Sequence, residues 1–208
     1  MNAAFRQSQQ GAVLIVALIM LVVVTLLAVG SMRSVTLETR LTAHRAHTTQ
    51  LVNSADAGLR EAEFRYYGPG HIESKLKPTP ANCTASNRLR TNGVNTPCLL
   101  AITSTKLAEF VNRPDKATAS FLDSVSTSSL VWMPYVGTDA AATTTASNKF
   151  SVGWNSILVG ESATAAINAE YGAVLEGQGT YFYLNNAKAG DELYLQSTHA
   201  NIYLGLNN

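Results

Sequence analysis

Residues 12–29 read AVLIVALIMLVVVTLLAV, and this run decides how the rest of the chain is organised. Thr25 is its one polar residue, and no charged side chain occurs between Gln7 and Met32. About 20 apolar residues in helical conformation span the ~30 Å hydrocarbon core of a bilayer. The run is therefore long enough to cross a membrane as one helix.

The helical pattern does not stop where the apolar run ends. Apolar or small residues recur every three or four positions over 37–66, and charged residues, Glu61 and Arg65 among them, fill other positions. This spacing is typical of a helix with one apolar stripe. The sequence predicts one continuous helix, with a membrane-spanning half over residues 12–32 and an amphipathic half over residues 33–67.

Gly68-Pro69-Gly70 marks the expected end of this helix, and no earlier proline interrupts it.

Four interpretations of the apolar run compete. The first is the core helix of a soluble protein, but 18 apolar or nearly apolar residues in a row are more than the apolar stripe of such a helix requires. A cleaved secretory signal would explain Arg6, but its apolar region would be too long and its cut badly placed. A plain single-pass anchor fits the length, and the fourth interpretation also explains the polar leader that ends in Gly11.

The fourth interpretation comes from a resemblance. QQGAVLIVALIMLVVVTLLAVGSMRSVTLETRL (9–41), followed by VNSADAGLREAE (52–63), resembles the amino-terminal region of type IV pilins and in detail that of PilX-type minor pilins. The resemblance implies that a prepilin peptidase removes a leader, residues 1–11, by cutting between Gly11 and Ala12. Ala12 would then become the N-methylated amino terminus, and the exposed helix would pack with other minor pilins and the major pilin.

Two departures from that family affect the expected role. Major pilins mostly begin with Phe after the cut, where this chain has Ala12. They also carry a glutamate as the fifth residue, which pairs with the amino terminus of a neighbouring subunit, and here that residue is Val16. A subunit without this carboxylate need not dock beneath an earlier one, which implies a filament tip or initiation complex. Tip pseudopilins of type II secretion systems share the missing glutamate.

Charge is unevenly distributed along the chain. Residues 1–116 carry 13 Lys and Arg against 7 Asp and Glu, and residues 117–208 carry 2 against 7. No basic block or nucleic-acid-binding motif appears, so no nucleic-acid partner is expected. The arginines near the span, with Arg6 before it and three after it, do not support an orientation with the carboxy-terminal domain outside the cytoplasm. That orientation, with the helix in inner-membrane lipid and residues 68–208 in the periplasm and later in the pilus, is expected from the resemblance and the cysteines.

The two cysteines, Cys83 and Cys98, enclose a polar segment with a strong turn signal at Asn92-Gly93. Their spacing is not that of a metal site, and His71 alone does not complete one. In an oxidising periplasm we expect them to form a disulfide, whereas a cytosolic location would remove that expectation.

Residues 68–208 are expected to form a β-rich domain. Residues 71–97 are expected to form a loop, followed by a strand over Leu99–Thr103 and short helices over Thr105–Val111 and Lys116–Leu122. Leu130–Val136 is expected to be a strand that Pro134 confines to a sheet edge or a bulge. Phe150–Trp154 and Ser156–Val159 are expected to be two strands around a tight turn or one bent strand. The further strands expected are Tyr171–Leu175, Thr180–Leu184, Glu192–Gln196 and Asn201–Leu204, with turns at Gly177 and Asn185–Asp191. We expect residues 137–148 to form a surface loop. A long helix packed on an antiparallel sheet is an α+β fold.

A search for chemistry gives no catalytic site, and no cofactor or metal is expected. His44 and His47 could share a metal at helical spacing, but solvated or packing roles are favoured. Asp191-Glu192 near Asn185 and Asn186 could bind calcium, without the spacing of an EF-hand loop. His199 has no visible partner for catalysis.

Two classes of function remain from the sequence. The first is a structural subunit, a minor pilin that contacts other pilins and a tip adhesin, with the type II tip pseudopilin as a narrower variant. The second is a single-pass anchored receptor or enzyme that keeps its amino terminus and binds a ligand through its β loops. Removal of residues 1–11 separates the two.

Overall fold

The computed structural model describes residues 9–90, 94–122, 129–137, 149–162 and 178–204. The chain forms two compact units, Met1–Thr49 and Gln50–Asn208, which are described separately. Helix α1, Gln9–Phe64, runs through both as one uninterrupted element, which confirms the predicted long helix. It ends slightly earlier than predicted, because the amides of Tyr66 and Tyr67 turn back to the carbonyls of Glu63 and Phe64.

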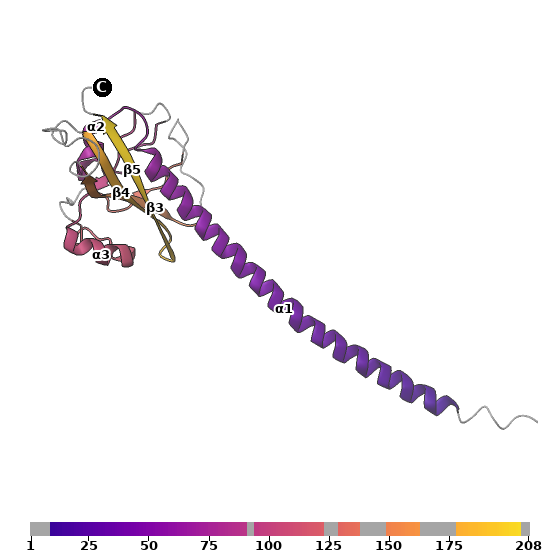
Figure 1. Ribbon diagram of the computed structural model, residues 1–208. Coiled ribbons are helices and arrows are strands. Elements are labelled where there is room, and N and C mark those ends of the chain that lie inside the picture. Colours follow the sequence, from indigo (N-terminus) through magenta and orange to yellow (C-terminus); the bar gives the residue numbers. More distant parts are fainter. Residues whose placement is uncertain (1–8, 91–93, 123–128, 138–148, 163–177, 205–208) are drawn as a thin grey trace, which may run out of the picture. The chain divides into compact units, whose positions relative to one another are not determined.

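The second unit is built on a five-stranded sheet with the order β1-β3-β4-β5 (Figure 1). The strands are β1 (Leu99–Leu100), β2 (Met133–Pro134), β3 (Val152–Ser162), β4 (Gln178–Ala189) and β5 (Leu193–Leu204). β1 and β2 pair with successive parts of one edge of β3, β1 in parallel and β2 antiparallel. The predicted antiparallel pairing holds for β2 with β3, β3 with β4 and β4 with β5, and the short strand β1 adds a parallel pairing that makes the sheet mixed. The α+β class holds.

Of the two alternatives predicted for the segments on either side of Asn155, one bent strand is confirmed: they form the single strand β3, with an irregularity between Leu158 and Gly160. Other predicted strand boundaries were wrong. The two segments predicted near the carboxy terminus form the single strand β5. Leu99–Thr103 forms strand only at its first two residues. Leu130–Val136 forms strand only at β2, which among the described strands pairs with β3 alone, so the edge position predicted from Pro134 is confirmed.

The turn predicted at Asn185–Asp191 was wrong because cross-strand side-chain bonds hold its first residues in β4. Ser156 Oγ donates to Asn185 Oδ1 at 2.6 Å, and Asn186 Nδ2 donates to Asn155 Oδ1 at 2.9 Å. These bonds satisfy buried amides that would otherwise favour a turn. The turn lies further on, at Gly190, whose φ of 58° suits glycine.

The helical predictions after α1 had mixed outcomes. The predicted helix over Thr105–Val111 is confirmed as α3, Ser104–Asn112. The loop predicted over 71–97 contains two short helical elements, α2 (Ile72–Leu76) and η1 (Pro80–Asn82). The helix predicted at Lys116–Leu122 is absent: a 3₁₀ turn, η2 (Pro114–Lys116), is followed by further turns.

Those turns form because the amides of Phe121 and Leu122 both bond the carbonyl of Thr118, and the hydroxyls of Thr118 and Ser120 bond each other. Tyr171–Leu175, the turn at Gly177 and most of the predicted 137–148 loop lie outside the described residues.

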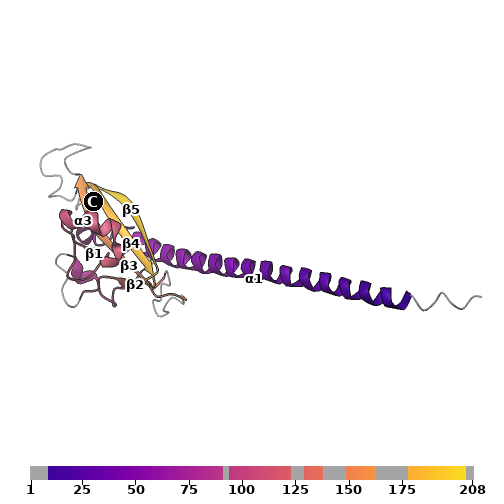
Figure 2. The same ribbon diagram turned by 90° about the horizontal axis from the view of Figure 1, so that it is seen from below.

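The core lies on both sides of the sheet, between the last turns of α1 and the segment around α3 (Figures 1 and 2). Leu59 and Ala62 of α1 belong to the same buried cluster as Trp154 and Ala187 of the sheet. Phe110 of α3 is also a member of this cluster. Gly58 allows α1 to lie close to the sheet, because a Cβ at this position would be 2.9 Å from Val152 Cγ1 of β3 and 3.2 Å from Ala187 Cβ of β4. Part of α1 is therefore an integral helix of this unit.

Candidate functional site

The first candidate site is the start of α1, where the sequence predicts a peptidase cut. Gly11 lies in a helix, and a Cβ placed there would meet nothing within 4 Å. Its φ is not among the positive values found for other glycines in the described residues. Neither space nor backbone conformation therefore requires glycine at this position, in contrast to Gly58. Processing would supply a requirement that the fold itself does not.

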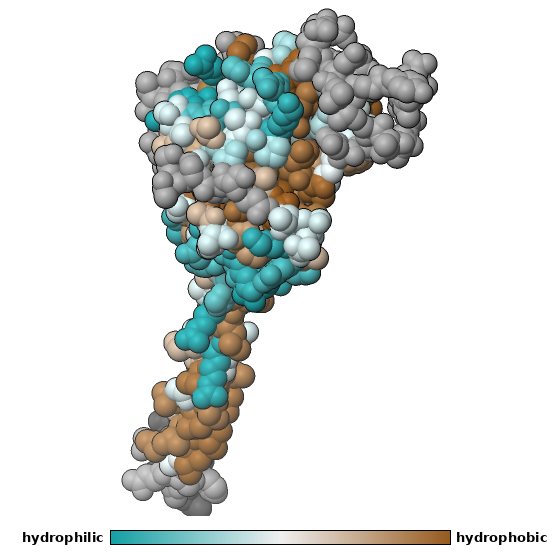
Figure 3. All heavy atoms as spheres, turned by 90° about the vertical axis from the view of Figure 1, so that its left-hand side faces the viewer, coloured by the Kyte–Doolittle hydropathy of each residue, from teal (hydrophilic) through white to brown (hydrophobic). Residues whose placement is uncertain are grey.

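The helix that follows exposes large apolar side chains all round its circumference. From Val13 to Val29 these side chains are 45–68% exposed within the chain (Figure 3). Among the described residues, one helix is long and apolar enough to cross a membrane, over Gly11–Phe64. A helix with no polar face is suited to lipid or to apolar neighbours rather than to water.

Several hydroxyl groups in this unit donate hydrogen bonds to carbonyls of the same helix. Thr25 donates to the carbonyl of Val22, and Ser31 donates to that of Leu27. The hydroxyls of Thr36, Thr39, Thr42 and Thr48 also donate to carbonyls four residues earlier. These bonds reduce the cost of placing hydroxyls in an apolar surrounding.

Val16 is 57% exposed and is surrounded by apolar positions along the helix. Glu38 is the first acidic residue of the whole sequence. The membrane-length half of α1 therefore contains no carboxylate that could pair with an amino terminus.

A second group of side chains fixes the end of α1 to the rest of its unit. Glu61 and Arg65, one helical turn apart and outside the apolar stripe of the sequence, are both buried and lie 2.9 Å apart. Glu61 also accepts hydrogen bonds from the amides of Val136 and Gly137, at 2.8 and 2.9 Å. The carboxylate thereby joins the helix to the segment after β2.

Arg65 connects the helix to the disulfide loop. Its guanidinium lies over the Trp154 ring, 4.9 Å from the centroid, and Nη1 donates to Asn87 Oδ1 at 2.8 Å. Burial lowers the pKa of Arg65, and the hydrogen bond and charge of Glu61 oppose that effect. Sequence periodicity could not reveal this pair, since i, i+4 charges are ordinary on solvent faces too.

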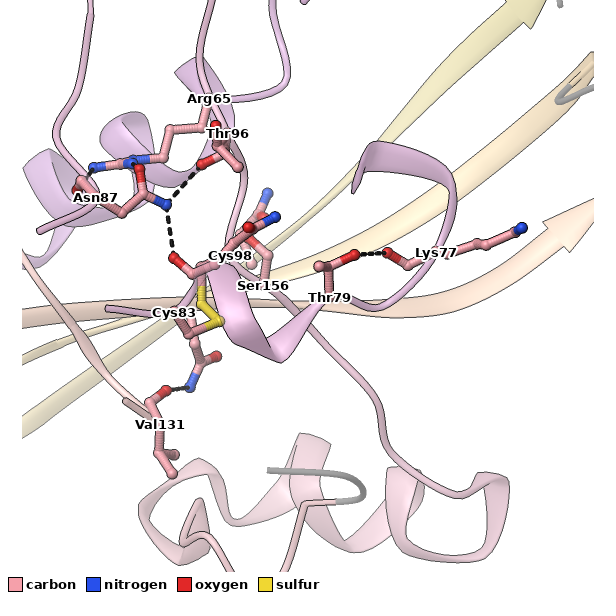
Figure 4. Close-up of a disulfide and its surroundings, with 12 residues drawn as sticks. Arg65, Lys77, Thr79, Cys83, Asn87, Thr96, Cys98, Val131 and Ser156 are labelled. Atoms are coloured by element: carbon pink, nitrogen blue, oxygen red, sulfur yellow. Dashed lines mark hydrogen bonds between the residues drawn. A yellow bond between two sulfur atoms is a disulfide. The ribbon is translucent and has the colours of Figure 1, made fainter. Parts of the chain in front are cut away.

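The cysteines predicted to pair, Cys83 and Cys98, form a disulfide, and both are fully buried (Figure 4). Beside it, Asn87 Nδ2 donates to the carbonyls of Asn82 and Thr96, at 2.8 and 2.9 Å. The disulfide and these amide bonds together close the loop that Arg65 reaches.

A third group surrounds His199. Its ring lies against Tyr66 and Tyr183, with centroids 4.9 and 4.8 Å away, and Nδ1 lies 2.6 Å from Asn185 Nδ2. Burial lowers the pKa of His199, and the charge of Glu63 opposes the shift. A cavity of about 120 Å³ borders this ring.

The His199 group does not have the geometry of a nucleophile and its base. Ser197, the nearby hydroxyl, donates to Glu63 Oε1 at 2.6 Å rather than to the histidine. The arrangement binds β5 to α1.

The structure does not bring the remaining candidates from the sequence, for a metal site and for a calcium site, together as binding sites. His44 and His47 lie in the first unit, and within the described residues no three His, Cys, Asp or Glu side chains form a group that could hold a metal. The calcium hypothesis fails on geometry, because Asn185 and Asn186 are buried within β4. Asp191 instead pairs with Lys188 at 2.9 Å.

Comparison with known proteins agrees with the features of the first site. The chain combines a long helix, in which Gly11 comes directly before an apolar run, with an α+β unit. Residues 10–60 match the family model PilX N-terminal, which is consistent with a PilX-type type IV pilin. The match supports a minor pilin of a type IV pilus. Neither the curated proteins nor the solved structures compared with this chain gave a match.

Proposed function

We propose that this protein is a minor pilin that is cut between Gly11 and Ala12, is N-methylated at Ala12, and acts at the tip or in the initiation complex of a type IV pilus. The observation that carries the proposal is Gly11, a glycine with open space around it that lies in α1 immediately before the apolar run that starts at Ala12. The proposed role is structural rather than enzymatic.

The physical basis of assembly is the exposed apolar half of α1. In the membrane, lipid covers these side chains, and in a filament the equivalent helices of other pilins replace the lipid. A carboxylate in hydrocarbon is costly unless it is paired. Val16 avoids that cost without a partner, which supports a position where no neighbouring amino terminus is available.

The proposed orientation places Gln50–Asn208 outside the cytoplasm. The Cys83–Cys98 disulfide supports it, since disulfides persist in oxidising compartments. Prepilin peptidase, other minor pilins, the major pilin and a tip adhesin are the proposed partners.

Gly11→Val tests the processing step directly. We expect this variant to insert into the membrane but to keep residues 1–11, because a bulky side chain would occupy the peptidase's glycine position. The intact mass of protein recovered from membranes gives the result. Gly30→Val is the matched control, since Gly30 also lies in α1 with open space around it and should leave processing unchanged. Normal processing of Gly11→Val would contradict the proposal.

Position in the filament is tested by immunogold labelling of sheared pili. We expect label at one filament end, and fewer pili when the protein is absent. Label distributed along the filaments would contradict a tip position. Association with a secretion complex, without any change in piliation, would favour the type II pseudopilin instead.

A further inference from the structure

The disulfide loop carries a hydrophilic cavity that the proposed assembly role does not use. The cavity has a volume of about 420 Å³, within the range of small-ligand sites. Val94 and Ala81 are its apolar lining residues, and the others carry hydroxyl, amide, imidazole or guanidinium groups. A ligand that fits it must therefore be hydrophilic.

Charge in this part of the chain has one sign. No Asp or Glu occurs between Glu73 and Glu109, and no acidic side chain is among the described residues that line the cavity. Arg88 and Arg90 line it, both exposed, on either side of the buried Leu89. Within the described residues neither guanidinium forms an ion pair or a side-chain hydrogen bond. Two arginines without carboxylate partners favour an anion.

The backbone that carries these arginines is held from both ends. Asn95, itself buried, accepts from the amide of Arg90 at 2.6 Å and donates to its carbonyl at 2.7 Å. At the other end, Asn87 is held by Arg65 and by two carbonyls of the loop (Figure 4). The arginines thus project from a fixed frame, which lowers the entropy cost of ligand binding.

Two further features of the lining point to a bound group. Asn82 Nδ2 is buried and has no hydrogen-bond partner in the described part of the chain. His71 has a φ of 52°, a left-handed conformation that is uncommon for non-glycine residues. Unsatisfied buried donors and strained backbone both concentrate at binding sites.

We propose that this cavity binds a sugar acid, with the carboxylate held by Arg88 and Arg90 and the hydroxyls held by the neutral side chains. Guanidinium groups pair with carboxylates in bidentate geometry, which favours a carboxylate over an uncharged ligand. Asn82, Thr84 and Thr96 offer the donors and acceptors that ring hydroxyls require. The lining residues that the structure describes include no aromatic ring on which a nucleobase could stack, which argues against nucleic acid.

The test measures binding of D-galacturonate to the full chain in detergent micelles by saturation-transfer difference NMR. We expect saturable binding at least tenfold tighter than that of D-galactose, which lacks the carboxylate, and tighter than that of inorganic phosphate, which lacks the hydroxyls. The double variant Arg88→Ala/Arg90→Ala should weaken galacturonate binding at least tenfold. Polygalacturonate in a parallel titration identifies the source: tighter binding per residue indicates a surface polysaccharide, and equal or weaker binding indicates free sugar.

Arg113→Ala is the matched control, an exposed arginine outside the cavity that pairs with Asp115. It should leave galacturonate binding unchanged, and thermal melting should be the same for all variants because the backbone bonds of Arg90 remain. No saturable binding, equal binding of galactose or phosphate, or undiminished binding by the folded double variant would overturn the proposal. None of these results depends on the processing of Gly11.

Discussion

At the scale of single residues, two charge pairs on α1 have the same spacing and different surroundings. Asp56 and Arg60 lie one helical turn apart at the surface, with a 2.7 Å contact between side chains that are 47% and 77% exposed. Glu61 and Arg65 have the same separation, but their side chains are 1% and 0% exposed. The exposed pair contributes little to stability, whereas loss of one partner from the buried pair leaves an uncompensated charge.

Glu61→Gln is therefore expected to destabilise the fold strongly. The change keeps the shape of the side chain but leaves the buried Arg65 without its countercharge, at a cost of about 3–5 kcal/mol. Asp56→Asn, the matched exposed change, should cost less than about 1 kcal/mol. Urea unfolding of the detergent-solubilised chain measures both, and equal effects would contradict the buried role of Glu61.

Gly58 is expected to tolerate no side chain. A methyl group there would lie 2.9 Å from Val152 Cγ1, so Gly58→Ala should destabilise the protein by about 1–3 kcal/mol through overpacking. The control is Gly160→Ala in the same unit, where a Cβ meets nothing within 4 Å. Thermal melting of both variants gives the comparison, and a Gly58→Ala variant as stable as the control would show that the helix can move away.

Stability should decline as the pH falls, through His199. Its lowered folded-state pKa means that the unfolded chain binds the proton more readily, so stability is full above the ordinary histidine pKa of about 6.5 and decreases below it. The groups that face the ring are Glu63, Tyr66, Tyr183 and Asn185. The charge of Glu63 opposes the shift of the His199 pKa without reversing it.

Urea unfolding between pH 7.5 and pH 5 tests this dependence. His199→Gln should flatten the profile in that range, whereas His71→Gln, at an exposed histidine, should leave it unchanged. A profile for His199→Gln as steep as that of the unmodified chain would place the pH dependence elsewhere.

At the scale of elements, the sequence predicted what depends on local pattern and missed what depends on tertiary contacts. The long helix, α3 and the cysteine pair follow from periodicity, turn signals and spacing. Asn185 and Asn186 favour turns in isolation, yet cross-strand amide bonds keep them inside β4. The parallel β1 pairing depends on residues more than 50 positions away, which no local pattern records.

The disulfide loop provides a prediction for a whole element. Cys83→Ala/Cys98→Ala should lower the free energy of unfolding by about 3 kcal/mol, the chain-entropy value for a loop of this length. Reduction of the unmodified protein should produce a similar loss. Urea unfolding with and without dithiothreitol measures it, and an unchanged midpoint in both experiments would contradict the stabilising role.

At the scale of the whole molecule, the two units differ in the exposure of their apolar side chains. In Gln50–Asn208, residues such as Trp154, Leu99 and Phe110 are fully buried. In Met1–Thr49, Leu14, Leu18 and Leu26 are each 60–68% exposed. Apolar surface in contact with water is unfavourable. The exposed apolar side chains of Met1–Thr49 therefore require lipid or neighbouring helices around them.

The same contrast applies to glycine and leads to the central claim. Gly58 is required by packing, whereas Gly11 has no structural requirement within the described residues and lies in α1 directly before the apolar run. A peptidase that recognises Gly11 would explain why glycine occurs there and why a polar leader precedes the span.

The most direct test is the intact mass of the unmodified protein recovered from membranes, with and without the host's prepilin peptidase. The account predicts a chain that begins at N-methylated Ala12 when the peptidase is present and keeps residues 1–11 when it is absent. An intact leader in the presence of the peptidase, or a cut near Ser31, would contradict it and leave an ordinary anchor or a secreted domain.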